Sequence, residues 1–193
     1  MTEPVRVALV TGAARGVGAA TVAALAAGGW RVVAADRCAD DPALPYPLGT
    51  RAELDQVVEA AAGDAVAVEA DVRDPEALAA AVRLAEERWG GLDAAVAAAG
   101  VIAGGVPGWQ VPAGQERAVL DVDLGGVLNL ARVAVPALLR RPEPRRGRFL
   151  AVASAAATRG LPMLAAYGAA KAGCPVSKAL TGVDITLDAA LED

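Results

Sequence analysis

Two side chains near the end of the chain have types and a spacing that could bring them into one reactive site. Tyr167 and Lys171 lie four residues apart in the stretch AAYGAAKAG. Residues four apart on a helix share a face, so the phenol and the ammonium group can point into one site. The sequence contains no histidine, which excludes Ser-His-Asp and Cys-His nucleophile systems and argues against a zinc site.

A glycine-rich turn near the start of the chain could bind phosphate. The stretch VTGAARGVGAA places Gly12, Gly16 and Gly18 between an apolar strand-like run and a helical pattern. Glycines permit a tight turn and let backbone N–H groups approach a pyrophosphate at the helix N-terminus. An ordinary strand–helix turn could carry the same glycines, so the pattern is weak evidence until other features support it.

Acidic residues end the next two expected strands. Asp36 can accept hydrogen bonds from both hydroxyl groups of an adenosine ribose and would repel a 2′-phosphate, which favours NAD over NADP. Arg37 could instead pair with such a phosphate, and Asp36 could simply be a solvated strand end. Asp71 and Val72 could contact the amino group and the face of adenine, although a strand-end aspartate is also common as a helix cap.

Length and composition limit the class of protein. The chain has 193 residues, a formal charge of −5 and 55% hydrophobic residues, which suits one domain with a real core. The acidic balance argues against a nucleic-acid surface, and the basic run at 140–148 is interpreted as a solvated connection rather than an anion site. No apolar run approaches the roughly 18 to 20 residues of a membrane span, and the N-terminus is no secretory signal. We therefore expect no membrane partner. Because Cys38 and Cys174 form no metal or redox motif, we expect a cytoplasmic protein with free thiols.

Apolar strand-like runs alternate with helical patterns along the chain. The expected strands are 5–12, 30–36, 65–71, 92–100 and 147–154. The expected helices are 16–29, 50–63, 74–91, 116–141 and one that carries the Tyr-Lys pair. Thr50 with Glu53, and Asp74 with Pro75, indicate two helix starts. The alternation predicts an α/β fold, a Rossmann-type doubly wound parallel sheet flanked by helices in three α/β/α layers, as a single domain over residues 1–193.

As a set, these motifs resemble the short-chain dehydrogenase/reductase family. The resemblance rests on TGAARGVG at 11–18, ADV at 70–72, AAAG at 97–100, Ser154, Tyr167 and Lys171. Ser154 precedes Tyr167 by the family's usual distance, and the resemblance covers the chain from about Val5 to Gly173. It implies hydride transfer between NAD and a small-molecule secondary alcohol or ketone, and association into a homodimer or homotetramer.

The resemblance also implies roles for single residues. Tyr167 would be the acid/base; an unperturbed tyrosine has a pKa near 10, and the charge of Lys171 would favour tyrosinate. Lys171 would also bind the nicotinamide ribose, and Ser154 would hold the substrate oxygen. The alternative is a half-buried tyrosine, a lysine that extends to solvent and a strand-end serine. The implied cofactor-binding set is Gly12, Ala14, Arg15, Gly16, Val17, Gly18, Asp36, Arg37, Asp71, Val72, Ala98, Ala99, Gly100, Tyr167 and Lys171.

Two positions depart from the family pattern. The family has Asn-Asn-Ala-Gly where this chain has AAAG at 97–100, so side chains that brace the strands are missing. The family's fourth catalytic residue is an asparagine, and the stretch DVDLGG puts Asp123 there, with Asn129 too far along to replace it. Asp123 could accept a hydrogen bond from the water of a proton relay and could pair with Lys171. Its negative charge would oppose tyrosinate, which leaves the pH optimum open.

A narrower resemblance follows the second expected strand. Residues 36–58 are similar to an insertion in the mycofactocin-associated branch of the family, and residues 152–171 also fit that branch. In that branch the insertion covers an NAD that stays bound between turnovers, and electrons leave to another carrier, here mycofactocin. Pro42, Pro45 and Pro47 would stiffen such a loop, and a surface loop with no covering role is the alternative.

The chain after Gly173 departs from the family's usual order. The family continues into a further strand, a turn at the nicotinamide and a substrate-covering loop, whereas here the stretch CPVSKALTGVDITLDAALED follows at once and resembles the family's last strand. We expect a missing segment at the Gly173/Cys174 junction, with a real deletion as the alternative. A non-catalytic NAD-binding redox sensor or truncated remnant, and a structural subunit of a hetero-oligomer, remain alternative functions.

Overall fold

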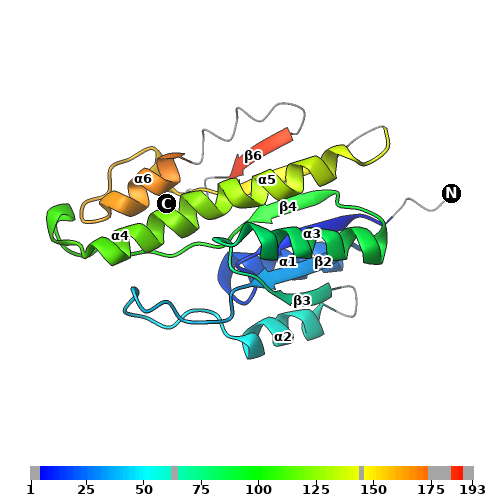
Figure 1. Ribbon diagram of the computed structural model, residues 1–193, viewed down its shortest axis with the longest axis horizontal. Helices are drawn as coiled ribbons and strands as arrows, with labels where there is room; N and C mark the ends of the chain where they lie inside the picture. The colour runs from blue at the N-terminus through cyan, green and yellow to red at the C-terminus, as the bar shows by residue number, and fades with distance from the viewer. Residues whose placement is uncertain (1–4, 62–64, 144–145, 174–183, 189–193) are drawn as a thin grey trace.

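The computed structural model describes residues 5–61, 65–143, 146–173 and 184–188. Within these residues, a six-stranded parallel sheet forms the middle layer (Figure 1). Its strands are β1 (Val7–Thr11), β2 (Arg31–Asp36), β3 (Ala65–Glu69), β4 (Ala94–Ala97), β5 (Arg148–Val152) and β6 (Asp184–Asp188). The spatial order is β3-β2-β1-β4-β5-β6, so the direction of winding reverses between β1 and β4. The predicted Rossmann-type sheet is confirmed.

The end of the chain adds one strand to this sheet. The stretch expected to form a last strand contains β6, which pairs in parallel with β5 and aligns Arg148 with Asp184. The Gly173/Cys174 junction, at which a missing segment was expected, borders residues 174–183, which lie outside the described residues.

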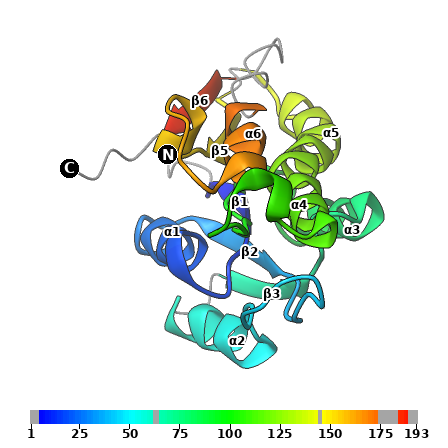
Figure 2. The same cartoon turned by 90° about the vertical axis from the view of Figure 1, so that its left-hand side faces the viewer.

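Helices cover both faces of the sheet. They are α1 (Gly16–Ala27), α2 (Arg51–Ala60), α3 (Pro75–Trp89), α4 (Ala113–Leu120), α5 (Gly126–Leu139) and α6 (Ala165–Gly173). Figure 2 shows α1 and α3 on opposite sides of the sheet. On one face Leu9 packs with Leu78 of α3 and Leu130 of α5, and on the other Val10 packs with Leu54 of α2. Neighbouring residues of β1 therefore enter different cores, as the pleat of a strand requires.

Local sequence signals set two of the helix starts as predicted. The Thr50 hydroxyl accepts a hydrogen bond from the Glu53 backbone N–H, and the Glu53 carboxylate accepts from the Thr50 N–H, which makes a complete capping box. Asp74 caps α3 with Pro75 at its first position, and Gly90 ends α3 in the left-handed conformation.

The helix expected over 116–141 is longer at its start and is not uniform. It begins at Ala113 and contains a π-helical segment, Asp121–Gly125, between α4 and α5. The expectation of one long helix is confirmed, with a π-helical segment inside it that the sequence did not predict. Gly125 and Gly126 are weak α-helix formers, and a Cβ on Gly126 would lie 2.5 Å from Cγ2 of Val72. This close approach fixes the path of the chain next to Asp123.

The same stretch also corrects the expectation that no apolar run has the length of a membrane span. Among the described residues, Ala113–Leu139 is 27 residues long and apolar enough to cross a bilayer by length and composition alone. In the fold, 44% of the most apolar 18-residue stretch of this helix is buried. Its second half, α5, packs against α3, β4 and β5. This packing is that of a core helix.

The basic run at 140–148 begins with arginines that hold the end of α5 in place. Arg140 pairs with Glu86 of α3, with 2.7 Å between Nη2 and Oε1. Arg141 pairs with Asp93, with 2.7 Å between Nε and Oδ1, and its Nη1 donates to the carbonyl of Gly90. The interpretation as a solvated connection was wrong for Arg141, because its side chain is only 22% exposed.

Candidate active site

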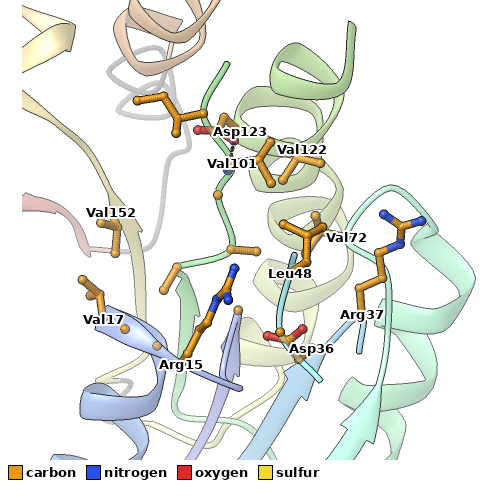
Figure 3. A pocket seen from close by; sticks show the side chains of 18 of the residues that line it. Arg15, Val17, Asp36, Arg37, Leu48, Val72, Val101, Val122, Asp123 and Val152 are labelled. Atoms are coloured by element: carbon orange, nitrogen blue, oxygen red, sulfur yellow. Dashed lines mark hydrogen bonds between the residues drawn. The ribbon is translucent and has the colours of Figure 1, made fainter. Parts of the chain in front are cut away.

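A cavity of about 460 Å³ opens at the carboxyl ends of β1, β2, β4 and β5 (Figure 3). These strand ends flank the reversal point between β1 and β4, where ligands bind in sheets of this type. Asp36 and Arg37 lie toward one end of the cavity, and Asp123 lies toward the other (Figure 3). Every residue predicted for the site lines the cavity except Ala14 and Ser154.

The glycine turn connects β1 to α1 at the floor of the cavity. Gly12 has a φ of +67°, and a Cβ there would lie 2.6 Å from Cα of Ala99. A Cβ on Gly18 would collide with the carbonyl of Gly12, so α1 can pack this close only with glycine at both positions. The Thr11 hydroxyl joins β1 to β4, since it donates to the Val96 carbonyl at 3.3 Å and accepts from the Ala99 N–H. It supplies part of the bracing that AAAG at 97–100 lacks.

Asp36 is held at the end of β2 by two backbone groups. Its Oδ2 accepts from the Ala14 N–H at 3.0 Å and its Oδ1 accepts from the Cys38 N–H at 3.1 Å. A carboxylate has about four lone-pair positions, so each oxygen keeps capacity for a ligand hydroxyl. Ala14 therefore acts through its N–H on Asp36. Burial, followed by the charge of Asp36, raises the pKa of the half-buried Cys38 thiol to about 11.

Four charged side chains form an ion cluster beside Asp36. Arg37 pairs with Asp41 at 3.0 Å and with Asp71 at 3.2 Å, and Arg73 pairs with both carboxylates at 2.8 and 2.7 Å. Burial tends to raise the pKa of Asp71, but hydrogen bonds from Arg73 and the charge of Arg37 lower it overall. The N–H of Ala43 and the charge of Arg73 likewise lower the pKa of Asp41. Arg37, considered from the sequence as a partner for a 2′-phosphate, is already paired with two carboxylates.

The insertion after β2 forms part of the cavity wall. The Tyr46 hydroxyl accepts from the N–H of Ile102 and donates to the carbonyl of the same residue, both at 2.9 Å. Arg15, from the glycine turn, donates to the Pro47 carbonyl at 2.7 Å. Leu44 is buried in a cluster that also includes Tyr167. The insertion is thus tied to the phosphate turn, to the segment after β4 and to α6, and burial raises the pKa of Tyr46.

The predicted Tyr-Lys pair lies at the opposite end of the cavity. Tyr167 and Lys171 both come from α6, and the Lys171 ammonium lies over the Tyr167 ring, 5.5 Å from its centroid. Lys171 Nζ donates to the Val152 carbonyl of β5 at 3.3 Å and lies 3.2 Å from Oδ2 of Asp123. The pairing of Asp123 with Lys171, suggested from the sequence, is therefore present in the structure.

Asp123 is deeply buried in the π-helical segment. Its side chain has 0% exposure, and Oδ1 accepts from the Val101 N–H at 2.7 Å (Figure 3). Burial raises the pKa of Asp123, while the charge of Lys171 and the hydrogen bond from Val101 oppose that rise. Asn129 instead donates to the Val72 carbonyl, which agrees with its exclusion from the site.

Ser154 does not line the cavity. Its hydroxyl accepts from the Ala156 N–H at 3.2 Å and caps the short 3₁₀ turn Ala155–Ala157. Serine readily makes such a local cap, which uses a lone pair of the hydroxyl oxygen and leaves its O–H as a donor. The structure thus brings Tyr167, Lys171 and the glycine turn to one cavity and leaves Ser154 beside it.

A family profile for short chain dehydrogenases matches residues 6–177, which include the glycine turn and the Tyr-Lys pair. The chain belongs to the short-chain dehydrogenase family. Two relatives are similar to this chain over 87% of its length. An uncharacterised oxidoreductase of Mycobacterium tuberculosis is 38% identical over 177 residues, and (−)-trans-carveol dehydrogenase of Rhodococcus erythropolis is 39% identical over 171. The chain spans 62% and 61% of the lengths of these two relatives.

Two solved structures superpose closely on this chain. Carveol dehydrogenase from Mycobacterium avium, in complex with NAD, has a TM-score of 0.81 at 31% identity and covers 88% of this chain. A short chain dehydrogenase from Mycobacterium paratuberculosis, bound to NAD, has a TM-score of 0.82 at 31% identity and covers 90%. This chain covers 61% and 65% of those two chains. Both neighbours hold the cofactor predicted for this chain from Asp36.

Proposed function

We propose that this protein binds NAD and transfers a hydride between it and a secondary alcohol or ketone. The observation that carries the proposal is that the glycine turn and the Tyr167–Lys171 pair, which lie far apart in sequence, line one cavity. The residues present fit a dinucleotide: Gly12 leaves no room for a side chain, and the first residues of α1 line the cavity. Asp36 retains capacity for ribose hydroxyls.

The proposed chemistry separates the hydride from the proton. Bound NAD would supply the hydride acceptor, next to the alcohol carbon. The ionised Tyr167 oxygen takes the hydroxyl proton as the carbon–oxygen double bond forms, and it returns that proton in ketone reduction. Lys171 holds positive charge next to Tyr167 and has a third N–H for the nicotinamide ribose, beyond those facing Val152 and Asp123. Ser154 would donate its O–H to the substrate oxygen while its own oxygen still accepts from the Ala156 N–H.

NAD is proposed over NADP for two reasons. The Asp36 carboxylate lines the adenosine end of the cavity, where it would repel a 2′-phosphate. Arg37 is paired with Asp41 and Asp71, so it could take a phosphate only by giving up those partners. Asp71 and Val72 would form the adenine side of the same site, with Asp71 shared with Arg73.

We also propose that NAD stays bound between turnovers and that electrons leave to a mycofactocin-type carrier. The support is the insertion, which is fastened to three separate parts of the cavity wall by Arg15, Tyr46 and Leu44. Denaturing the purified protein and assaying the supernatant for NAD tests the first part. Protein that contains no NAD after purification would contradict it.

The test of the main function is oxidation of a panel of secondary alcohols with a dye as electron acceptor, with and without added NAD. Carveol belongs in the panel because two similar proteins are carveol dehydrogenases. Tyr167→Phe should lose at least about a hundredfold in rate, because a positioned acid/base contributes about 10²–10⁴-fold. A Tyr167→Phe protein as active as the wild type would contradict the proposed mechanism, provided that circular dichroism shows the same fold.

The activity panel and the behaviour of the protein during purification separate the alternative functions. A protein that binds NAD but oxidises no member of the panel would support a non-catalytic NAD-binding role. A protein that is obtained only together with another dehydrogenase would support a structural subunit. A homodimer or homotetramer is proposed from the family resemblance, to be checked by light scattering, and the cytoplasmic location stays a prediction.

A further inference from the structure

The ammonium group of Lys171 interacts with both Tyr167 and Asp123. On one side it lies over the Tyr167 ring, and on the other Oδ2 of Asp123 is 3.2 Å away. The Val152 carbonyl takes a further N–H. Gly100 lies directly beside this pair, since a Cβ there would be in van der Waals contact with Oδ2 of Asp123 at 3.4 Å and with Nζ of Lys171 at 3.5 Å.

The ion pair is shielded from water. The side chain of Lys171 is 7% exposed and that of Asp123 is 0% exposed. Charges in such a place are screened little by salt, so the carboxylate offsets the field of the ammonium at close range. The Val101 N–H holds Oδ1, which keeps Oδ2 turned toward Lys171.

We infer that Asp123 is a positioning residue for the proton transfer: it draws Lys171 toward the π-helical segment and offsets its charge, so that Tyr167 gives up its proton, and alcohol oxidation rises, at a higher pH than with a neutral side chain at position 123. This inference rests on the proposed function for its kinetic part only. The charge balance at Tyr167 can be measured without turnover.

The other titratable groups at this end of the cavity are the same in the wild type and in an Asp123→Asn variant. Tyr46, from the insertion, lines the cavity with Tyr167 and feels the charges of Asp123, Arg15 and Asp41. Lys171 is the cation on α6 itself, and β5 contributes the Val152 carbonyl. Replacing Asp123 by the isosteric asparagine removes one negative charge and leaves all of these groups in place.

The sequence offers a clean optical test, because the chain has two tyrosines, Tyr46 and Tyr167. In a Tyr46→Phe background, the ultraviolet absorbance of tyrosinate reports Tyr167 alone. Adding Asp123→Asn should lower the midpoint of that titration by about one pH unit, because the charge of Lys171 is then no longer offset. In a Tyr46-containing protein, the rise of kcat/KM for alcohol oxidation should move down by the same amount. At pH values below both midpoints, Asp123→Asn should then be about tenfold faster.

The matched control is Asp121→Asn, which removes the same charge two residues away from an exposed position on the same segment. It should move neither midpoint. An unchanged or higher midpoint for Asp123→Asn, or an equal shift for Asp121→Asn, would overturn the inference. If Asp123→Asn does not fold, Asp123→Ser makes the same charge change and must show the same downward shift. A shifted titration in a protein that oxidises no alcohol would overturn the proposed function and support the charge coupling.

Discussion

Replacing Lys171 by methionine should destabilise the fold, because it leaves Asp123 buried without its cation. At the 3.2 Å separation of Nζ and Oδ2, two unit charges attract by about 5 kcal/mol at an effective dielectric constant of about 20. Removing one partner of a buried ion pair costs about 3–5 kcal/mol in measured cases. We therefore expect Lys171→Met to lose about 3 kcal/mol of unfolding free energy at neutral pH, a large part of the stability of an ordinary domain.

The assay is urea unfolding followed by circular dichroism, with both single variants and the double variant. Asp123→Asn in the Lys171→Met background removes the buried charge that has lost the ammonium group, so the double variant should recover about 2 kcal/mol or more. Arg51→Met is the matched control. Arg51 and Asp55 form a closer pair, at 2.9 Å, but their side chains are 50% and 46% exposed. Loss of this exposed pair in Arg51→Met should leave the unfolding free energy nearly unchanged.

The pH dependence gives a second check on the same variant. Burial raises the pKa of Asp123, and loss of Lys171 removes an attraction that opposes the rise. A carboxyl group with a raised pKa in the folded state stabilises the fold at low pH and loses that contribution as the pH rises through that pKa. Lys171→Met should therefore lie closest to the wild type in acid and fall behind above about pH 4. A loss under about 1 kcal/mol, additive single effects or a gap that does not change with pH would refute the reasoning.

Three further predictions concern the insertion after β2 and the glycine turn. Tyr46→Phe removes two hydrogen bonds that fasten the insertion, which are worth about 1.5 kcal/mol together. Bound NAD should therefore be lost about tenfold faster during gel filtration. An unchanged rate of loss would show that the insertion does not retain NAD. Gly12→Val should abolish NAD binding in calorimetry and lower the melting temperature, because its φ of +67° and the 2.6 Å approach to Ala99 leave no room; normal binding would contradict the assigned turn. With Cys174 replaced by alanine, Cys38 should resist alkylation at neutral pH in the folded protein and react readily in urea, because its pKa of about 11 keeps the thiol protonated; equal rates would argue against its burial.

The sequence predicted best those parts of the site that depend on short-range backbone rules. Gly12 and Gly18 sit where a strand turns into a helix, and Asp36 sits where a strand ends, so order along the chain was enough to bring them together. The Tyr167–Lys171 spacing placed both side chains on one face of α6 in the same way.

The parts that the sequence did not predict depend on contacts between distant segments. Tyr46 and Asp41 lie in an insertion with no helical or strand period, so nothing local indicated that they would reach Ile102 and Arg73. The cap that Ser154 makes on its own turn was not predicted either, because residue type does not decide between a local and a distant hydrogen-bond partner.

The π-helical segment also determines how α4 and α5 face their neighbours. One residue of an α-helix corresponds to a rotation of about 100°, so an extra residue in one turn changes the direction of every side chain beyond it. Before the segment α4 packs against α6, and after it α5 packs against α3. Deleting one residue within Asp121–Gly125 would rotate one helix relative to the other and carry Asp123 away from Lys171. The number of residues in this stretch, as much as their identity, therefore keeps the acid opposite the lysine.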